Sequence, residues 1–240
     1  RSKFLLEVEV NIFPDTLTWT HDYSYSFNDP TTKNYFWHSA FDDYPVVGIN
    51  WKQATAFAHW RTKMMNSFLR AIKQPTLPDF RLPTESEWEY ASRGGLDASP
   101  YPWGGPYTRN LQGCFLANFK PLRGNYVADG GLKAIKTASY NPNGYGLYDM
   151  AGNVAEWTSN AYDESAYSYS HDMNSDYHFN AKDDDNEVLK RKSIRGGSWK
   201  DIAYFIQTST RSFEYQDTAK SYIGFRCAVD FLGRDKKDFE

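Results

Sequence analysis

Residues 80–95 read FRLPTESEWEYASRGG, and this stretch decides the fold of the chain. Thr84 and Glu87 have the spacing of a capping box, in which each side chain bonds the backbone N–H of the other residue. The two glycines that close the stretch are typical of a helix C-terminus, where a left-handed residue ends the last turn. The stretch therefore predicts a helix that begins after Thr84 and directs Trp88 into the core.

A longer helix is predicted from Asn50 to Leu69. Asn50 can cap it, and Gln53 stands where the reciprocal residue of a capping box is found. Apolar residues recur at the helical period and predict a face directed into the core. This stripe contains Ala54, Phe57, Ala58, Met64, Met65 and Phe68, and is interrupted by Arg61.

The rest of the chain carries few signals of regular structure. Residues 96–187 are rich in glycine and proline, which mark turns, so buried aromatic packing or bound cations must hold this stretch. Residues 188–199 and 223–231 are rich in β-branched and aromatic residues and predict strands. We therefore expect one α+β domain with two helices, a small antiparallel sheet and many ordered loops.

The first 45 residues are polar but rich in aromatic side chains. Tyr23, Tyr25 and Phe27 alternate, which predicts short strands with these rings on one face. Two interpretations stay open for this segment. It covers the core, or it forms an exposed aromatic surface that docks a partner.

Composition excludes several classes of protein. Aromatic residues make up 18% of the 240 residues, which argues against disorder. A net charge of -3 argues against a broad basic surface and hence against nucleic acid as a partner. Cys114 and Cys227 are the only cysteines, too few for a cysteine-rich zinc site. The chain begins at Arg1 without a methionine, so we expect a processed or partial product.

Further motifs follow the 80–95 stretch in a fixed order. They are NGYGLYDMAGNVAEW at 143–157, RGGSW at 195–199, Arg211, and GFRC at 224–227. Together these motifs resemble the formylglycine-generating enzyme (sulfatase-modifying factor) family over residues 44–231. The resemblance implies a C-type-lectin-like variant fold, with residues 1–43 as a family-specific N-terminal extension and 232–240 as a tail.

The enzymes of this family use two cysteines, five residues apart, just after the Gly-Gly-Ser-aromatic motif, to bind copper. Here Asp201 stands at the first position and Ile206 at the second. Soft thiolates suit Cu(I), and neither residue replaces them. We therefore expect no copper and no enzymatic activity. A residual cleft is expected at Trp157, Ser198 and Asp201.

The resemblance also implies calcium as a cofactor, bound at two sites. Oxygen ligands from loops are those that Ca²⁺ prefers. The first site contains the side chains of Asn118 and Asp129 and the carbonyls of Phe119 and Gly131. The second contains Gly152, Asn153, Val154 and Glu156. The alternative is that Asn153 and Glu156 only satisfy backbone groups.

A narrower resemblance rests on the N-terminal segment, with FPDTLTW at 13–19, and on YQDTAKSYIGFRC at 215–227. These stretches are similar to the gliding-motility and type IX secretion lipoproteins of the GldK/PorK type, with the GldJ type a close alternative. That resemblance implies a lipid-anchored protein on the periplasmic face of the outer membrane. Its lipid-bearing cysteine would lie upstream of Arg1, and it would self-associate into a ring with a GldN/PorN-type partner.

Aromatic side chains are the expected contacts of such an assembly, since they make good interface anchors. The candidates are Trp19, Tyr23, Tyr25, Trp37, Tyr167 and Tyr169. Two other functions stay open: a ligand-binding module that displays its loops, and an enzyme that uses the residual cleft.

Overall fold

The computed structural model describes residues 9–122, 125, 127, 131–169, 176–231 and 233. Short helices α1 (Thr18–Asp22) and α2 (Pro30–Asn34) and the 3₁₀ turn η2 (Ser39–Phe41) precede the long helix α3 (Trp51–Ala71) and α4 (Glu85–Arg93). Strand β1 (Ala155–Ala161) and helix α5 (Ala166–Tyr169) follow. The 3₁₀ turn η3 (Glu187–Lys190) and strands β2 (Arg191–Arg195), β3 (Ser212–Tyr215) and β4 (Ile223–Gly224) complete the order. Among the described residues, no helix is both long and apolar enough to cross a bilayer.

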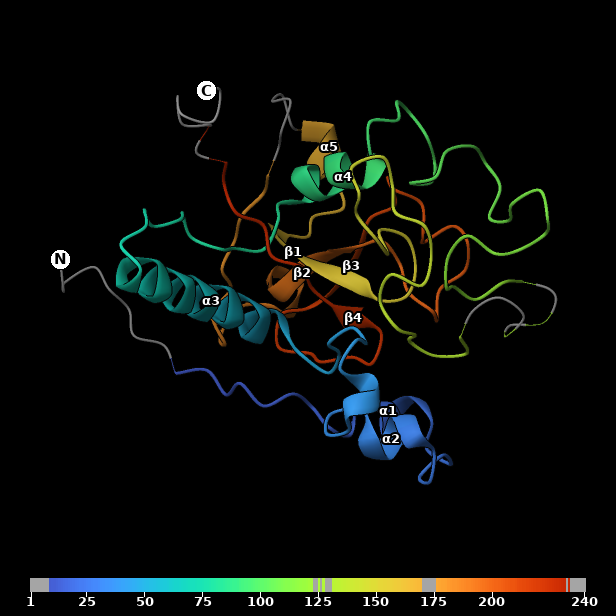
Figure 1. The fold of residues 1–240 in the computed structure, drawn as a ribbon, viewed down its shortest axis with the longest axis horizontal. Helices are drawn as coiled ribbons and strands as arrows, with labels where there is room; N and C mark the ends of the chain where they lie inside the picture. Colours follow the sequence, from blue (N-terminus) through green and yellow to red (C-terminus); the bar gives the residue numbers. More distant parts are fainter. Residues whose placement is uncertain are drawn as a thin grey trace.

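A small four-stranded sheet lies at the centre of the domain, between α4 on one side and the helices α1 and α2 on the other (Figure 1). Its strand order is β3-β2-β1-β4. β2 pairs antiparallel with both β1 and β3, whereas β1 and β4 are parallel. The expected α+β class is confirmed, but the sheet is mixed and not wholly antiparallel. The difference arises because residues 216–222 carry the chain from the β3 edge to the opposite edge.

Both helices predicted from capping boxes are present. In α4, Thr84 accepts a hydrogen bond from the backbone N–H of Glu87, Glu87 caps Thr84 in return, and Gly94 is left-handed at φ 58°. In α3, Asn50 and Gln53 form the same reciprocal pair. These local signals are independent of the rest of the fold, which explains why the sequence predicts them well.

The face that α3 buries differs from the prediction. Its buried residues are Ala54, Ala58, Thr62 and Asn66, whereas Phe57, Met64 and Phe68 are exposed. Thr62 Oγ1 accepts a hydrogen bond of 2.8 Å from the N–H of Phe80, and Asn66 bonds both backbone groups of Leu77. The extended segment 77–80 thus packs on the side of α3 that carries Thr62 and Asn66. The large apolar side chains of the helix face outward.

The N-terminal segment forms short helices, so the predicted strands there are wrong. Asp29 caps α2 by accepting a hydrogen bond of 3.0 Å from the N–H of Thr31, and Pro30 fills the first helical position. The alternating rings at 23, 25 and 27 lie in the turns between α1 and α2 and not in a strand. Tyr25 and Phe27 are exposed.

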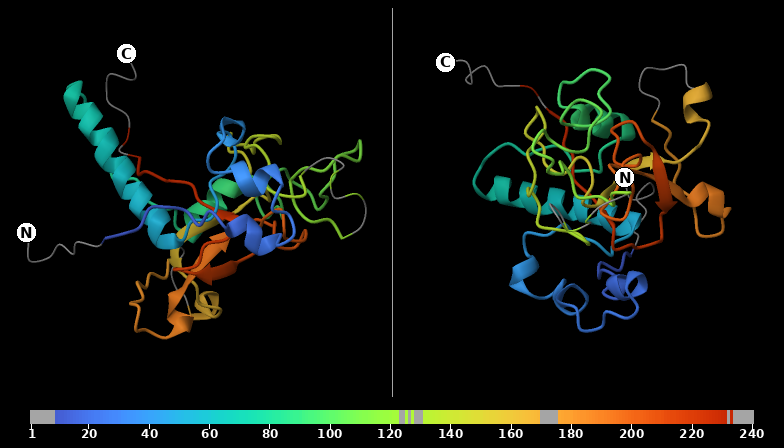
Figure 2. Two further views of the ribbon diagram at one scale, coloured as in Figure 1. Left: turned by 90° about the horizontal axis from the view of Figure 1, so that it is seen from below. Right: turned by 90° about the vertical axis from the view of Figure 1, so that its right-hand side faces the viewer.

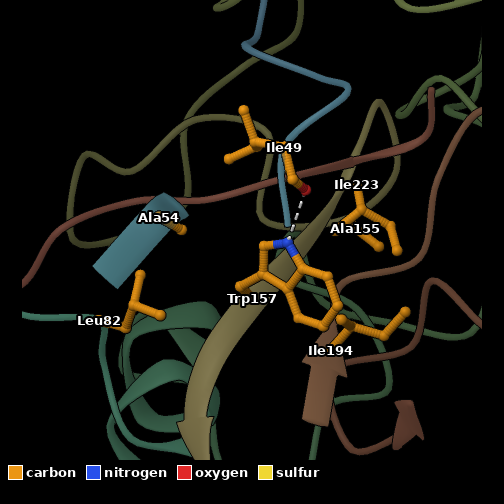
Figure 3. Close-up of a cluster of buried hydrophobic side chains, with 7 residues drawn as sticks. All are labelled: Ile49, Ala54, Leu82, Ala155, Trp157, Ile194 and Ile223. Atoms are coloured by element: carbon orange, nitrogen blue, oxygen red, sulfur yellow. Dashed lines mark hydrogen bonds between the residues drawn. The ribbon is translucent and has the colours of Figure 1, made fainter. Parts of the chain in front are cut away.

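The core consists of three clusters of buried side chains. Figure 3 shows the one between the sheet and α3, in which Trp157 is fully buried among Ile49, Leu82 and Ile194. A second cluster joins Trp19 and Tyr35 to Trp199 beneath the N-terminal segment. The third lies under the long loops and contains Ile206.

Residues 94–154 contain no helix or strand in the part that the structure describes. Buried asparagines hold this stretch by bonding backbone groups. Asn143 donates to the carbonyl of Ala91 at 2.7 Å and accepts from the N–H of Leu147 at 3.0 Å. Asn153 bonds both the N–H and the carbonyl of Ile135. Side-chain amides here take the place of a strand ladder.

Candidate functional site

A buried ion-pair network joins the motif helix α4 to the sheet. Glu85 accepts hydrogen bonds of 2.6 and 3.0 Å from the guanidinium of Arg211, and Ser193 donates to the same carboxylate at 3.1 Å. Arg195, whose side chain is fully buried, pairs with Glu89 and lies 3.6 Å from Glu85. Buried charges need such partners, because an unpaired one is costly.

A second buried carboxylate extends this network to the end of the chain. Both oxygens of Glu156 bond Arg226 at 2.6 Å, and Trp88 Nε1 donates to the same side chain at 2.7 Å. The motifs at 80–95, 143–157 and 224–227 therefore meet at Glu156. Glu156 and Arg226 hold these motifs together, and both carboxylate oxygens of Glu156 are already bonded.

The position of the expected residual cleft lies three residues beyond Arg195. Ser198 is fully buried, and its hydroxyl donates a hydrogen bond of 2.6 Å to Asp201. Asp201 also accepts from the N–H of Lys120 through its backbone carbonyl at 2.8 Å. Burial raises the pKa of the Asp201 carboxyl above its usual value.

Little space remains around this pair. The cavity beside Asp201 has a volume of about 20 Å³ and is lined by Gly196, Gly197 and Phe205. That is room for about one water molecule. A Cβ at Gly197 would lie 2.7 Å from the carbonyl oxygen of Phe205, so the segment 201–206 packs directly onto the glycine pair. A peptide substrate has no access to Ser198 here.

The residues that stand in for the copper-binding cysteines do not fit a copper ion. Ile206 is fully buried in the third core cluster, and Asp201 is bonded to Ser198. Cys114 and Cys227 are both free thiols that are partly buried. Among the described residues, no group of three or more His, Cys, Asp and Glu side chains could hold a metal ion.

Trp157 was expected in the residual cleft, and the structure corrects this. It is fully buried in the core, where its Nε1 donates to the carbonyl of Ile49 at 3.3 Å (Figure 3). The residue lies on β1, and its ring packs in the core cluster that also contains Ala54 of α3. Trp157 is a core residue.

The first set of expected calcium ligands is partly described. Asn118 is buried, and its amide donates to the carbonyl of Lys133 at 2.9 Å. Phe119 and Gly131 line the same cleft, of about 440 Å³. Asp129 lies outside the described residues.

In the second set of expected calcium ligands, the side chains already bond other groups of the protein. Glu156 is paired with Arg226 and Trp88, and the side-chain amide of Asn153 bonds Ile135. Gly152 and Val154 are buried on either side of Asn153. This geometry agrees with the alternative in which Asn153 and Glu156 satisfy groups of the protein itself.

The expected interface aromatics separate into core and surface residues. Trp19 is fully buried between Tyr35 and Trp199, at ring distances of 5.1 and 5.9 Å, so its expected role as an exposed anchor is wrong. Tyr23 is half-buried and stacks on Trp199 at 5.9 Å. Tyr25 and Trp37 are 97% and 71% exposed. Tyr167 and Tyr169 belong to α5, and their side chains lie outside the described part.

Sequence reasoning missed one of the residues that attach the N-terminal segment to the domain. The ammonium of Lys133 bonds Asp29 and Thr31, each at 2.7 Å, and lies 4.4 Å from the centre of the Tyr23 ring. The 440 Å³ cleft beside it was missed as well. Its walls come from residues 22–23, 119–120, 131–132 and 199–200, and no local pattern connects segments so far apart.

Comparison with known proteins gives consistent results. The family model for the sulfatase-modifying factor enzyme 1-like domain matches residues 16–231. The chain is 34% identical to the inactive C-alpha-formylglycine-generating enzyme 2 of Bos taurus, over 78% of this chain and 50% of that protein. It is 33% identical to the formylglycine-generating enzyme of Streptomyces coelicolor, over 78% and 53% of the two chains.

Solved structures agree on the fold. PvdO from Pseudomonas aeruginosa aligns with a TM-score of 0.60 at 24% identity, covering 79% of this chain and 63% of its own. The chain spans about half the length of the curated relatives it matches. Relatives named as inactive and relatives named as enzymes both match, so similarity alone does not assign an activity.

Proposed function

The chain belongs to the family of sulfatase-modifying factor enzyme 1-like domains, and we propose that it is a non-catalytic member that serves in protein assembly. The observation that carries this proposal is the closed site after the Gly-Gly-Ser motif. Ile206 fills one cysteine position as a core residue, and Asp201 at the other is bonded to the buried Ser198. Neither a thiolate pair nor room for a peptide is present there.

The proposed assembly is that of the GldK/PorK-type lipoproteins. In it the protein is anchored by a lipid on the periplasmic face of the outer membrane and forms a ring with a GldN/PorN-type partner. The sequence of the N-terminal segment supports this proposal. So does its rigid attachment, because Lys133 and Trp199 hold the segment while Tyr25 and Trp37 stay exposed. Exposed aromatic rings on a fixed support suit a protein interface.

The test is purification of the full-length protein from its native membrane in mild detergent. We expect a megadalton complex that contains a second component in stoichiometric amount. Trp37→Ala should reduce the complex while leaving the melting temperature unchanged. Tyr107→Ala is the matched control, because Tyr107 is an equally exposed ring in a different loop, at 76% against 71%. A monomer from wild-type membranes, or an intact complex with Trp37→Ala, would contradict the proposal.

Calcium binding is a separate proposal, and the first ligand set fits it better. Phe119 and Gly131 line one cleft, next to the buried Asn118, and these three residues would supply oxygen ligands, whereas Glu156 of the second set is paired with a guanidinium. A bound ion would link residues 118–119 to Gly131. We expect calcium to raise the melting temperature, since a ligand that binds only the folded state stabilises it.

The rise in melting temperature with calcium distinguishes a calcium ligand from a residue that only stabilises the fold. Asn118→Ala should lose the shift, whereas Asn143→Ala should keep it. Both variants remove a buried amide that bonds backbone carbonyls. Equal melting temperatures in calcium and in a chelator would count against the site.

The 440 Å³ cleft favours a second candidate function, a ligand-binding module. Its floor contains the stacked rings of Tyr23 and Trp199, and its rim carries Lys120 and Lys200. Its volume lies in the range of small-molecule sites. Saturable binding of a small ligand that Tyr23→Ala abolishes would support this function, and a screen without hits would remove it.

A further inference from the structure

The outward side of α3 carries a row of large apolar side chains. Phe57, Trp60, Met64 and Phe68 recur at spacings of three and four residues and are between 41% and 61% exposed. We call these four residues the α3 stripe. Single exposed apolar residues are common, but a continuous row on one helix marks an interaction site.

The fold of the domain does not need this stripe. The opposite side of α3 faces the body through Ala54, Ala58, Thr62 and Asn66, and the C-terminal half of the helix extends beyond the rest of the domain (Figure 2). The rings of Phe57 and Trp60 contact each other at 5.5 Å, and Phe57 also contacts Phe225. Among the described residues, Phe68 forms no pair with another aromatic ring.

Charge on α3 is strongly one-sided. The helix contains Lys52, Arg61, Lys63 and Arg70, four of the 27 basic residues, and none of the 30 acidic ones. Lys63 and Arg70 are exposed, follow one flank of the stripe, and form no ion pair with the described residues. A chain of net charge -3 thus presents a cationic amphipathic helix.

A groove runs beside the stripe, on the flank that carries Lys63. It has a volume of about 830 Å³, its α3 lining runs from Trp51 to Lys63 and includes Trp60, and Val10 and Ala181 also line it. Trp60 belongs to both the stripe and the groove. Partner side chains can therefore enter beside Trp60 while the partner backbone follows the helix.

We propose that the α3 stripe docks an acidic amphipathic helix of a partner protein. The partner would bury apolar side chains on Phe57, Trp60 and Met64 and place carboxylates on Lys63 and Arg70. Helices recognise one another by such rows of anchors, and opposite charges along the flanks set the choice of partner. The proposal does not depend on a role in secretion.

Charge and shape argue against other occupants. A second copy would bring two cationic helices together, which like charges disfavour. An anionic bilayer prefers helices with a broad apolar face, whereas the stripe is about one side chain wide, like a coiled-coil seam. The acidic excess of the rest of the chain also opposes an anionic surface.

The test uses a fluorescent helical peptide of the length of α3, with leucine on one stripe and glutamate on both flanks. Fluorescence anisotropy with the whole chain should give micromolar affinity. A scrambled peptide of the same composition and a peptide with lysine in place of glutamate should each bind at least about tenfold more weakly. The glutamate peptide should also bind more weakly as salt rises.

Variants of the chain locate the binding. Met64→Ser/Phe68→Ser and Lys63→Glu/Arg70→Glu should each weaken binding by at least about tenfold. These side chains are exposed, so melting temperatures should stay close to wild type. The matched controls, Leu111→Ser and Lys33→Glu, change an exposed leucine and an exposed lysine away from α3 and should leave binding unchanged.

Three results would overturn the proposal. The glutamate peptide does not bind, or binds the stripe variants as well as wild type. Vesicles of phosphatidylcholine and phosphatidylglycerol bind through the stripe while the peptide does not, which would make α3 a membrane face. The protein sediments as a dimer that Met64→Ser/Phe68→Ser dissociates, which would make the stripe a self-interface.

Discussion

Arg195 and Ser198 are three residues apart in one motif, yet Arg195 belongs to a buried ion-pair network and Ser198 to a closed site. Arg195 lies in the buried network with Glu85, Glu89 and Arg211, and every charge there has a partner. Ser198 lies in the closed site, where its hydroxyl bonds Asp201 and the cavity has a volume of about 20 Å³. The comparison teaches that a family motif contains separate residues for holding the fold and for chemistry.

This separation has a physical cause. Buried charges destabilise the fold when one partner is lost, so a chain that keeps the fold must keep the network. A reactive thiol contributes little to stability, and an apolar side chain such as Ile206 fills its position well. The non-catalytic role that we propose is therefore compatible with an intact domain.

The largest effect is expected from breaking the network. Glu85→Ala would leave Arg211 and the buried Arg195 without a shared carboxylate, at a cost of about 4 kcal/mol in the free energy of unfolding. Urea denaturation measures this change. The control is Glu164→Ala, which removes an ion pair whose carboxylate is 75% exposed and should cost less than about 1 kcal/mol. Equal losses in both variants would show that the buried network has no special role.

An intermediate effect is expected from the closed site. Ile206→Ala should lower the free energy of unfolding by about 3 kcal/mol, because it opens a cavity in the third core cluster. The same measurement checks it. A loss below about 1 kcal/mol would mean that position 206 is loosely packed, and that an open pocket survives there.

The smallest effect should come from Asp201, and it should stabilise. Burial raises the pKa of Asp201 in the folded state, so the folded protein binds this proton more tightly than the unfolded chain. Stability from this group is therefore complete at low pH and is lost as pH rises through the folded pKa. Asp201→Asn should raise the melting temperature at neutral pH, with a gain that disappears below the ordinary pKa of an aspartate.

That variant keeps a side-chain oxygen to accept from Ser198, so the sign of the change reports on the charge. A lower melting temperature at neutral pH would show that the ionised carboxylate is needed. Asp201 would then have a favourable electrostatic role that burial does not describe.

The sequence predicted what local chemistry decides. The capping boxes at Asn50 and Thr84 placed α3 and α4 because their signals lie within four residues. It failed where distant segments compete for the same surface. The buried side of α3 depends on Thr62 and Asn66 bonding segment 77–80, which no helical period reveals.

The candidate site shows the same limit. The prediction that Asp201 and Ile206 stand at the cysteine positions rests on the family resemblance of the sequence alone. The core positions of Trp19 and Trp157 could not be predicted, because each has a partner more than 100 residues away, Trp199 for Trp19 and the carbonyl of Ile49 for Trp157. The role of Lys133 was hidden for the same reason, since its partners Asp29 and Thr31 lie in the N-terminal segment.

The most direct test of the central claim is a turnover assay with a cysteine-containing sulfatase peptide, copper and oxygen. Mass spectrometry would follow conversion of the cysteine to formylglycine, with an active formylglycine-generating enzyme as the positive control. The account predicts unchanged peptide with this protein, whether or not copper is added. Copper-dependent formation of formylglycine would contradict it, because it would show that a working site exists without a cysteine at 201 or 206.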